Sequence, residues 1–316
     1  MLLSSAGFGC FLGTHFVGAL AYADDLVLLA PTATALRKML AICDAYAQDY
    51  CITFNVLKTK CLVVLPHSRR ALFDRFEDYP FFLNNQAIEF VKSFVHLGHI
   101  ITSSSDDEED IRKRRNDFVG QVNSMISYFS NLDSFIRYKL FTSYCTSFYG
   151  CELWLLPHRA IEQFCVAWRK GLRMVWKLPY CTHSYLLPLI SQCLPVYDEI
   201  CRRSLNFLRS CVNHKSAVVR FVACHGIKFS IGSSLLGQNV MFCAQRFGCS
   251  VNDILQGSTN RIINLSVRQS VDLRMSGSAH LLRELLLLRD RVLTLSETNF
   301  FSHVELEDII DSVCTS

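Results

Sequence analysis

The sequence predicts an α+β protein, with a small antiparallel sheet and one packed helix in residues 1–102 and a mainly helical region after them. Two patterns support this prediction. Two short, wholly apolar runs of strand length flank Asp24 and Asp25, and from Ile111 onward apolar residues recur at helical spacing. Hydrophobic residues make up 50% of the 316 positions, so the chain can bury a sizeable core.

Charge and cysteine content narrow the class of protein. The net charge of +4 permits nucleic-acid binding without requiring it. The 15 cysteines are irregularly spaced and include no Cys-x-x-Cys pair, which favours reduced, mostly buried thiols in an intracellular protein. Cys211, His214, Cys224 and His225 offer zinc-type ligands, but adjacent residues cannot easily share a tetrahedral site, so ordinary thiols and histidines are the favoured interpretation.

The first 23 residues contain no Lys, Arg, Asp or Glu, which raises the question of a signal peptide. They also lack a basic start, and Gly7, Gly9 and Gly13 interrupt the apolar run. No other stretch has the roughly 18 uninterrupted apolar residues of a membrane span. We therefore expect no signal peptide, no membrane partner and an intracellular location, with cytoplasm and nucleus both open.

Residues 19–30 predict a β-hairpin with Asp24 and Asp25 at or beside its turn. Adjacent carboxylates repel each other, and burying either one unpaired is costly. Such a pair is most simply a solvated turn. The alternative is a metal site, because Mg²⁺ prefers carboxylate oxygens and phosphoryl-transfer enzymes often hold two ions roughly 4 Å apart.

The string Tyr22-Ala23-Asp24-Asp25, with apolar runs on both sides, resembles motif C of reverse transcriptases in the form found in non-LTR (LINE-type) retrotransposons. The resemblance implies that Asp24 and Asp25 are catalytic ligands of Mg²⁺. It also implies that Tyr22 contacts nucleic acid.

After Pro31 and Thr32, helical spacing of apolar residues over 33–48 predicts a helix packed on the hairpin sheet, with Tyr50 on its apolar face. Residues 52–54 and 61–65 read as strands, and 67–87 as a connector. Residues 55–59 resemble motif D, which implies that Lys58 lies near the incoming nucleotide as proton donor or charge for departing pyrophosphate. A lysine between two strands is otherwise normally solvated.

Residues 90–101 predict a pair of strands bent near Gly98. Leu97 and Gly98 resemble motif E, the primer grip, which implies that they contact the primer. Leucine and glycine carry no reactive group, so the pair supports the resemblance only because it follows the motif C- and D-like strings in the expected order.

A helix is expected after Ser105, which could form a capping box with Glu108, and the acidic residues at 106–110 suit its first turn. A basic cluster follows at 112–115. A solvated helix face explains it. The alternative is that Arg112, Arg114 and Arg115 contact a nucleic-acid backbone, as in a polymerase thumb.

Further helices are expected at residues 132–148, 161–176, 198–211 and 281–293, with a looser pattern over 226–278. Bases and aromatic residues alternate in 161–176, where they could stack on nucleic acid or pack a core. Residues 149–154 resemble the Tyr-Gly-x-Glu-x-Trp signature that follows the thumb helices of LINE-type polymerases.

The ordered resemblances divide the chain into a partial palm carrying motifs C, D and E (1–102), a helical thumb and connection (103–225), and a mainly helical region of uncertain role (226–316). They imply a truncated RNA-directed DNA polymerase that uses an RNA template, a DNA primer and deoxynucleoside triphosphates.

The family also needs an aspartate on an earlier strand, and residues 1–21 contain no acidic residue. We therefore expect the isolated chain to bind Mg²⁺ weakly and not to polymerise. The alternatives are a non-catalytic nucleic-acid-binding helical module and an unrelated structural protein that matches by chance.

Overall fold

The structure is a computed structural model that describes residues 2–64, 80–229, 231–257 and 260–267. The chain divides into two compact units. Unit 1 comprises Met1–Asp107 and His214–Val222, and unit 2 comprises Glu108–Asn213 and Ala223–Ser316. The boundary between the units at Asp107 and Glu108 lies a few residues after residue 102, where the partial palm was expected to end. The region after 226 belongs to the same unit as the preceding helices.

Unit 1 contains small separate sheets among its described residues, and not the single antiparallel sheet that was expected. Its strands are β1 (Phe11–Leu12), β2 (His15–Phe16), β3 (Ala19–Tyr22), β4 (Asp25–Leu28), β5 (Lys60–Leu62), β6 (Phe81–Leu83), β7 (Gln86–Val91), β8 (Ser93–His96) and β9 (His99–Thr102). The pairs β1–β2, β3–β4 and β8–β9 are antiparallel. The β5-β7-β6 sheet is mixed, because β5 runs parallel to β7 and a long connection between them allows that direction.

Helix α2 (Ala33–Asp49) confirms the helix predicted for this segment and follows the short α1 (Leu2–Ser5). Thr32 caps it, since its hydroxyl accepts a hydrogen bond from Ala35 N at 3.1 Å. The helix packs mainly on the β5-β7-β6 sheet and not on the hairpin, which reaches the same cluster only through Leu28. Tyr50, expected on the apolar face, is exposed. The buried cluster consists of Leu40, Cys43, Val56, Cys61, Phe81, Leu83 and Ile88.

Three strand predictions in unit 1 need correction. Residues 52–54 form no strand, and β5 is shorter than the predicted 61–65 run. Strand β6 and the start of β7 lie in the expected connector, most of which falls outside the described residues. Short apolar runs do not distinguish strand from irregular chain until a pairing partner is known.

Unit 2 is helical, as predicted. Its elements are α3 (Glu108–Tyr128), α4 (Ser134–Tyr144), the 3₁₀ turn η2 (Cys151–Leu153), α5 (Ala160–Val175), α6 (Leu186–Ser191), α7 (Val196–Val212), α9 (Leu235–Phe247) and α10 (Val251–Gln256). Helix α8 (Ala217–Lys228) begins in unit 1 and ends in unit 2. Helices α9 and α10 agree with the mainly helical region expected after 226, although the sequence pattern is looser there, and the helix expected at 281–293 lies outside the described residues.

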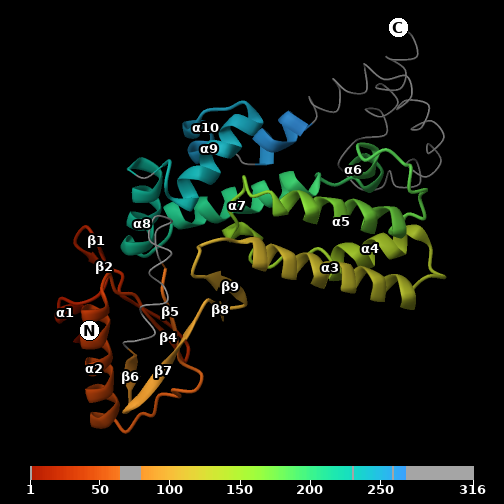
Figure 1. Cartoon of the computed structure of the whole chain (residues 1–316). Helices are drawn as coiled ribbons and strands as arrows, with labels where there is room; N and C mark the ends of the chain where they lie inside the picture. Colours follow the sequence, from red (N-terminus) through yellow and green to blue (C-terminus); the bar gives the residue numbers. More distant parts are fainter. Residues whose placement is uncertain (1, 65–79, 230, 258–259, 268–316) are drawn as a thin grey trace, which may run out of the picture. The chain divides into compact units, whose positions relative to one another are not determined.

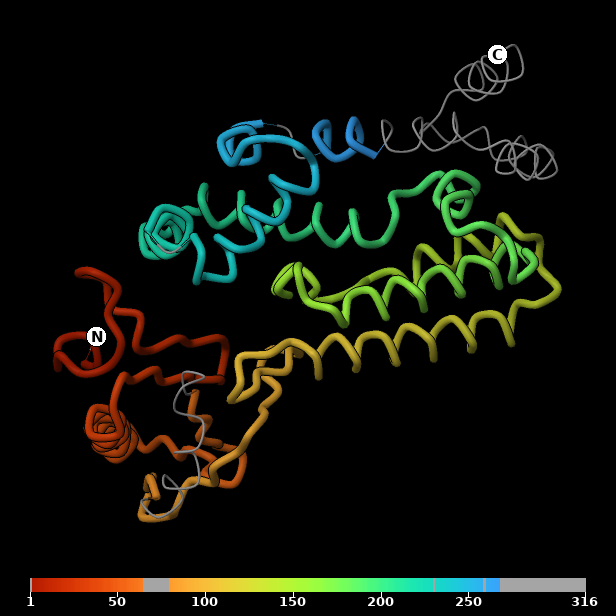
Figure 2. The backbone as a smooth tube through the Cα atoms, turned by 45° about the horizontal axis from the view of Figure 1, so that its top comes forward, coloured from red at the N-terminus to blue at the C-terminus, as the bar shows by residue number. Residues whose placement is uncertain are grey.

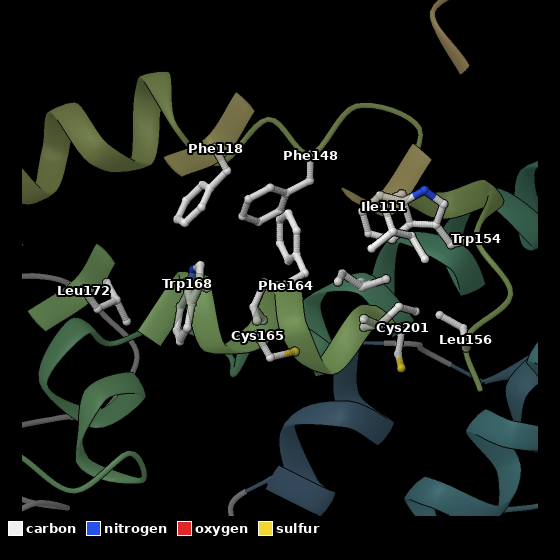
Figure 3. Close-up of a cluster of buried hydrophobic side chains, with 14 of the residues drawn as sticks. Ile111, Phe118, Phe148, Trp154, Leu156, Phe164, Cys165, Trp168, Leu172 and Cys201 are labelled. Carbon is white, nitrogen blue, oxygen red and sulfur yellow. The ribbon is translucent and has the colours of Figure 1, made fainter. Parts of the chain in front are cut away.

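Helices α3, α4 and α5 lie side by side along their lengths, with α7 against α5 (Figure 1). Their shared core is aromatic: the rings of Phe118, Phe148 and Phe164 have centroids 5.1 to 6.0 Å apart (Figure 3). Trp168 and Trp176 of the 161–176 segment are buried in the same core. Core packing therefore accounts for these aromatic residues, and they are not available to stack on nucleic acid.

The start of α3 differs from the predicted capping box. Ser105 has a φ of +53°, and its backbone N–H donates to Thr102 O at 3.0 Å, so it belongs to a turn before the helix. The acidic first turn is confirmed, because α3 begins at Glu108 and continues with Glu109 and Asp110. None of the described helices combines the length and apolarity needed to cross a bilayer.

Candidate active site

The predicted hairpin around the aspartate pair is confirmed. Strands β3 and β4 pair with Tyr22 opposite Asp25 and Leu20 opposite Val27, so Ala23 and Asp24 form the two-residue turn. Figure 2 shows the chain running out along this hairpin, reversing, and returning into α2, which is seen nearly along its axis. Both carboxylates therefore lie at the tip of a strand-to-strand reversal.

The two aspartates differ in how the backbone places them. Asp25 is the first residue of β4, and because opposite residues on paired strands share a face, its side chain lies on the same face as Tyr22. Asp24 belongs to the turn itself. Both are exposed, and neither side chain forms a hydrogen bond or ion pair with another described residue. Their oxygens are thus accessible to a cation from solvent.

A complete metal site would need more ligands than this pair provides. Among the residues that the structure describes, no group of three metal-ligating side chains includes Asp24 or Asp25. The hairpin and the residues before it contain no other acidic side chain. Mg²⁺ requires near-octahedral oxygen coordination, so two carboxylates alone would hold it only with several waters.

The hairpin is strained at its turn and apolar on its surface. Ala23 has a φ of +51°, in the left-handed region that costs a residue with a Cβ roughly 1–2 kcal/mol. Leu20, Tyr22 and Leu26 are exposed, and no other described strand pairs with β3 or β4. A two-residue hairpin turn favours positive φ at this position, and the unpaired edges leave backbone groups of β3 and β4 open to pairing with another strand.

We expect Ala23→Gly to stabilise the hairpin by about 1 kcal/mol, because glycine adopts positive φ without the Cβ clash. The measurement is hydrogen-exchange protection of the β3 and β4 amides. Ala21→Gly is the matched control, since the same change inside β3 should lower protection through lost strand propensity. Equal effects of the two changes would contradict strain at Ala23.

Lys58 lies on an exposed turn between α2 and β5. Asn55 builds this turn: its side-chain Oδ1 accepts Lys58 N–H at 3.1 Å, and its backbone oxygen accepts the Thr59 hydroxyl at 2.9 Å. The Asn and Thr of the motif D-like string therefore have a structural role. No hydrogen bond or ion pair within the described residues joins Lys58 to Asp24 or Asp25, so its catalytic role stays a prediction.

Leu97 and Gly98 form the turn between β8 and β9, where His96 pairs with His99. Their φ values are +48° and +78°, as a type I′ turn requires at both central positions. Gly98 suits this conformation and Leu97 does not, yet Leu97 keeps an exposed apolar side chain there. Turn geometry explains Gly98 but not the leucine before it, and the primer contact expected of this pair stays a prediction.

The predicted basic contacts at the start of α3 have different surroundings. Arg112 is exposed, as is its neighbour Lys113. Arg115 donates to Gln163 Oε1 at 3.0 Å. Arg114 is only 17% exposed and is 3.9 Å from the Asp110 carboxylate, with its guanidinium 5.4 Å from the Tyr149 ring centroid. Arg112 is therefore the most accessible of the three predicted contacts.

The sequence reasoning missed a buried polar network around the Tyr-Gly-x-Glu-x-Trp signature. The Trp154 indole donates to Asp110 Oδ2 at 2.8 Å, and both residues are fully buried. The Asn239 amide bridges the signature to α9, because Nδ2 donates to Trp154 O and Oδ1 accepts Leu156 N–H, each at 2.8 Å. Gly150 makes the turn possible with a φ of +83°. The signature thus connects the start of α3, through Asp110, to α9, through Asn239.

The cysteine and histidine group considered for zinc shows ordinary local contacts. His214 Nδ1 accepts Ser216 N–H at 3.1 Å, and the His225 ring lies 5.3 Å from that of Phe229. The cysteines within the described ranges are all free thiols. Burial raises the pKa of several of them, such as Cys61 and Cys145 to about 11, which keeps them protonated and unreactive.

Comparison with known protein families, curated proteins and solved structures gives no match. Any assignment of function therefore depends on this chain's own residues and their arrangement.

Proposed function

We propose that residues 7–210 form part of an RNA-directed DNA polymerase of the non-LTR retrotransposon type. The observation that carries the proposal is the placement of Asp24 and Asp25 at the tip of the β3–β4 hairpin, where both are exposed and neither side chain has a partner among the described residues. The order of the motif C-, D- and E-like strings, followed by the helical unit with its signature, supports it.

In this proposal Asp24 and Asp25 hold divalent metal ions, and Tyr22 contacts nucleic acid on the Asp25 face. A bound Mg²⁺ would stabilise negative charge on the phosphate oxygens of a deoxynucleoside triphosphate. Lys58 supplies positive charge to the leaving pyrophosphate. The third carboxylate has to come from outside residues 1–23, which contain no further acidic residue before Asp24. Because the hairpin and the residues before it supply only two carboxylates, we propose that the isolated chain does not polymerise.

A non-catalytic nucleic-acid-binding module is the second candidate. The exposed Arg112 and Lys113 in α3 favour it, because two accessible positive charges can contact phosphates without a metal. Within this candidate the aspartates are a solvated turn. The two candidates differ in whether the hairpin binds a cation.

The first test is cation binding by the hairpin, measured as Mn²⁺-induced broadening of amide NMR signals from β3 and β4. We expect selective broadening at roughly millimolar Mn²⁺, weakened by Asp24→Asn and by Asp25→Asn. Asp117→Asn is the matched control, because Asp117 is an exposed carboxylate on α3 and its loss should change nothing at the hairpin. Absence of broadening, or an equal effect of the control, would contradict the metal-binding role.

The second test separates binding from catalysis on a primer–template duplex. We expect the isolated chain to bind the duplex with an affinity that falls as salt rises, and to incorporate no nucleotide with Mg²⁺ present. Template-dependent incorporation would contradict catalytic incompleteness. A slope near zero in a plot of log affinity against log salt concentration would show that the chain makes no phosphate contacts, and would contradict both candidate functions.

A further inference from the structure

The stretch from Gln163 to Tyr197 contains no Asp or Glu, although it includes Arg169, Lys170, Arg173 and Lys177. It covers most of α5, the loop after it, and α6. Arg169 is paired with Glu162 at 2.8 Å. Lys170 and Lys177 are exposed and have no ion-pair partner among the described residues. This part of unit 2 thus presents uncompensated positive charge.

Exposed aromatic rings accompany this charge. Tyr180 is 80% exposed in the loop between α5 and α6, and Tyr185 is exposed at the end of that loop. The Tyr185 ring stacks on His183 with centroids 5.0 Å apart. These rings differ from Trp168 in α5 and from the C-cap residue Trp176, which are both buried in the core. Tyr180 therefore presents an aromatic face to solvent beside basic residues.

The loop is held in place by one arginine. Arg173 Nη2 donates to Thr182 O at 2.8 Å and to Ser184 Oγ at 3.2 Å, and its Nε also donates to Thr182 O. The guanidinium lies 5.8 Å from the Tyr180 ring centroid, a cation–π contact on one face of the ring. Because these bonds fix the loop, little conformational entropy is lost when a ligand stacks on the other face.

Along α5 the exposed positions continue this surface. Val166, Lys170 and Met174 follow one another at three- or four-residue spacing, and Lys177 comes next, just after the helix. Lys177 follows the C-cap residue Trp176, seven positions after Lys170. Two exposed lysines are thus followed along the chain by an exposed tyrosine. This arrangement suits a polyanionic ligand whose planar groups can stack on the ring.

We propose that the α5–α6 loop, with Tyr180 as its stacking residue and Lys170 and Lys177 as phosphate contacts, binds single-stranded RNA or DNA. An unpaired base stacks on the outer face of Tyr180, while the lysines neutralise adjacent phosphates. Duplex is excluded from this contact because its bases are already stacked on one another. The proposal is independent of the hairpin aspartates, since it requires neither metal nor catalysis.

The test is fluorescence anisotropy of the full chain with a labelled oligouridine of about 12 nucleotides, without divalent metal. We expect Tyr180→Leu to weaken binding by about tenfold or more and Tyr180→Phe to leave it unchanged. Tyr128→Leu is the matched control, because Tyr128 is 83% exposed on α3 and lies outside the acid-free stretch of sequence. Lys170→Gln and Lys177→Gln should each reduce the salt slope by roughly 0.7.

Three outcomes would overturn the proposal. The first is no binding of the oligonucleotide by the unaltered chain. The second is an equal loss of binding in Tyr180→Leu and Tyr128→Leu. The third is displacement of the oligonucleotide by polyglutamate at the same charge concentration, which would show that the surface binds acidic polypeptides without using the ring. Failure of hairpin metal binding would leave this result unchanged, so the two proposals are separable.

Discussion

Replacing Trp154 with phenylalanine will destabilise unit 2 by about 3 kcal/mol, because it removes a hydrogen bond to a buried carboxylate. The indole N–H of Trp154 donates to Asp110 Oδ2 at 2.8 Å, and neither side chain reaches solvent. Arg114, at 3.9 Å, remains as a charge partner but is too distant to replace this hydrogen bond. The measurement is the free energy of unfolding from urea denaturation.

Trp176→Phe provides the matched control. The Trp176 indole also donates within the core, to the neutral hydroxyl of Ser191 at 3.0 Å. Its replacement should therefore cost only about 1–2 kcal/mol, since no charged group loses its donor. A double-mutant cycle with Asp110→Ala isolates the pair, and a coupling energy below about 0.5 kcal/mol would contradict the interaction.

The Trp154–Asp110 pair also shows what the sequence could and could not predict. Asp110 was correctly placed in the first turn of α3, where acidic side chains suit the helix dipole. Nothing local marks it as the partner of an indole 44 positions away. Helical periodicity predicts that a segment such as 161–176 forms a helix with an apolar face, but not which polar group a core encloses.

The same distinction applies to unit 1. The hairpin was predictable because apolar runs on both sides of Asp24 and Asp25 specify a local, sequential pairing. The parallel pairing of β5 with β7 was not, since Cys61 and Phe90 meet across a long connection. The strained positions could not be predicted either, because no residue propensity favours positive φ for an alanine such as Ala23 or a leucine such as Leu97. Such exceptions are expected where function selects the residue.

The loop that leads into the Tyr-Gly-x-Glu-x-Trp signature depends on an ion pair from α7. Glu199 accepts hydrogen bonds from Arg202 at 2.6 and 2.7 Å and from Arg203 at 2.8 Å. Arg203 in turn donates to the backbone oxygens of Thr146 and Ser147, and its guanidinium lies 5.2 Å from the Phe148 ring centroid. Glu199 thereby fixes the arginine that holds this loop.

We expect Glu199→Gln to destabilise unit 2 by about 2 kcal/mol near pH 7, because the charge-assisted bonds to both arginines are weakened. Glu162→Gln is the matched control. Glu162 pairs with Arg169 at a similar 2.8 Å, but its side chain is 60% exposed against 19% for Glu199. Exposed pairs contribute little, so this change should cost less than about 0.5 kcal/mol. Equal costs would contradict the anchoring role of Glu199.

The pH dependence of the same variant gives an independent check. Burial by itself would raise the pKa of Glu199, but the hydrogen bonds and charges of Arg202 and Arg203 outweigh it and hold the pKa below its ordinary value of 4.5. A lowered pKa in the folded state means that the contribution is complete above the unfolded value and is lost as pH falls through the folded one. The stability difference between wild type and Glu199→Gln should therefore stay constant above about pH 5 and shrink progressively below pH 4.5. A difference that grows on acidification would reverse the assigned sign and show that burial dominates.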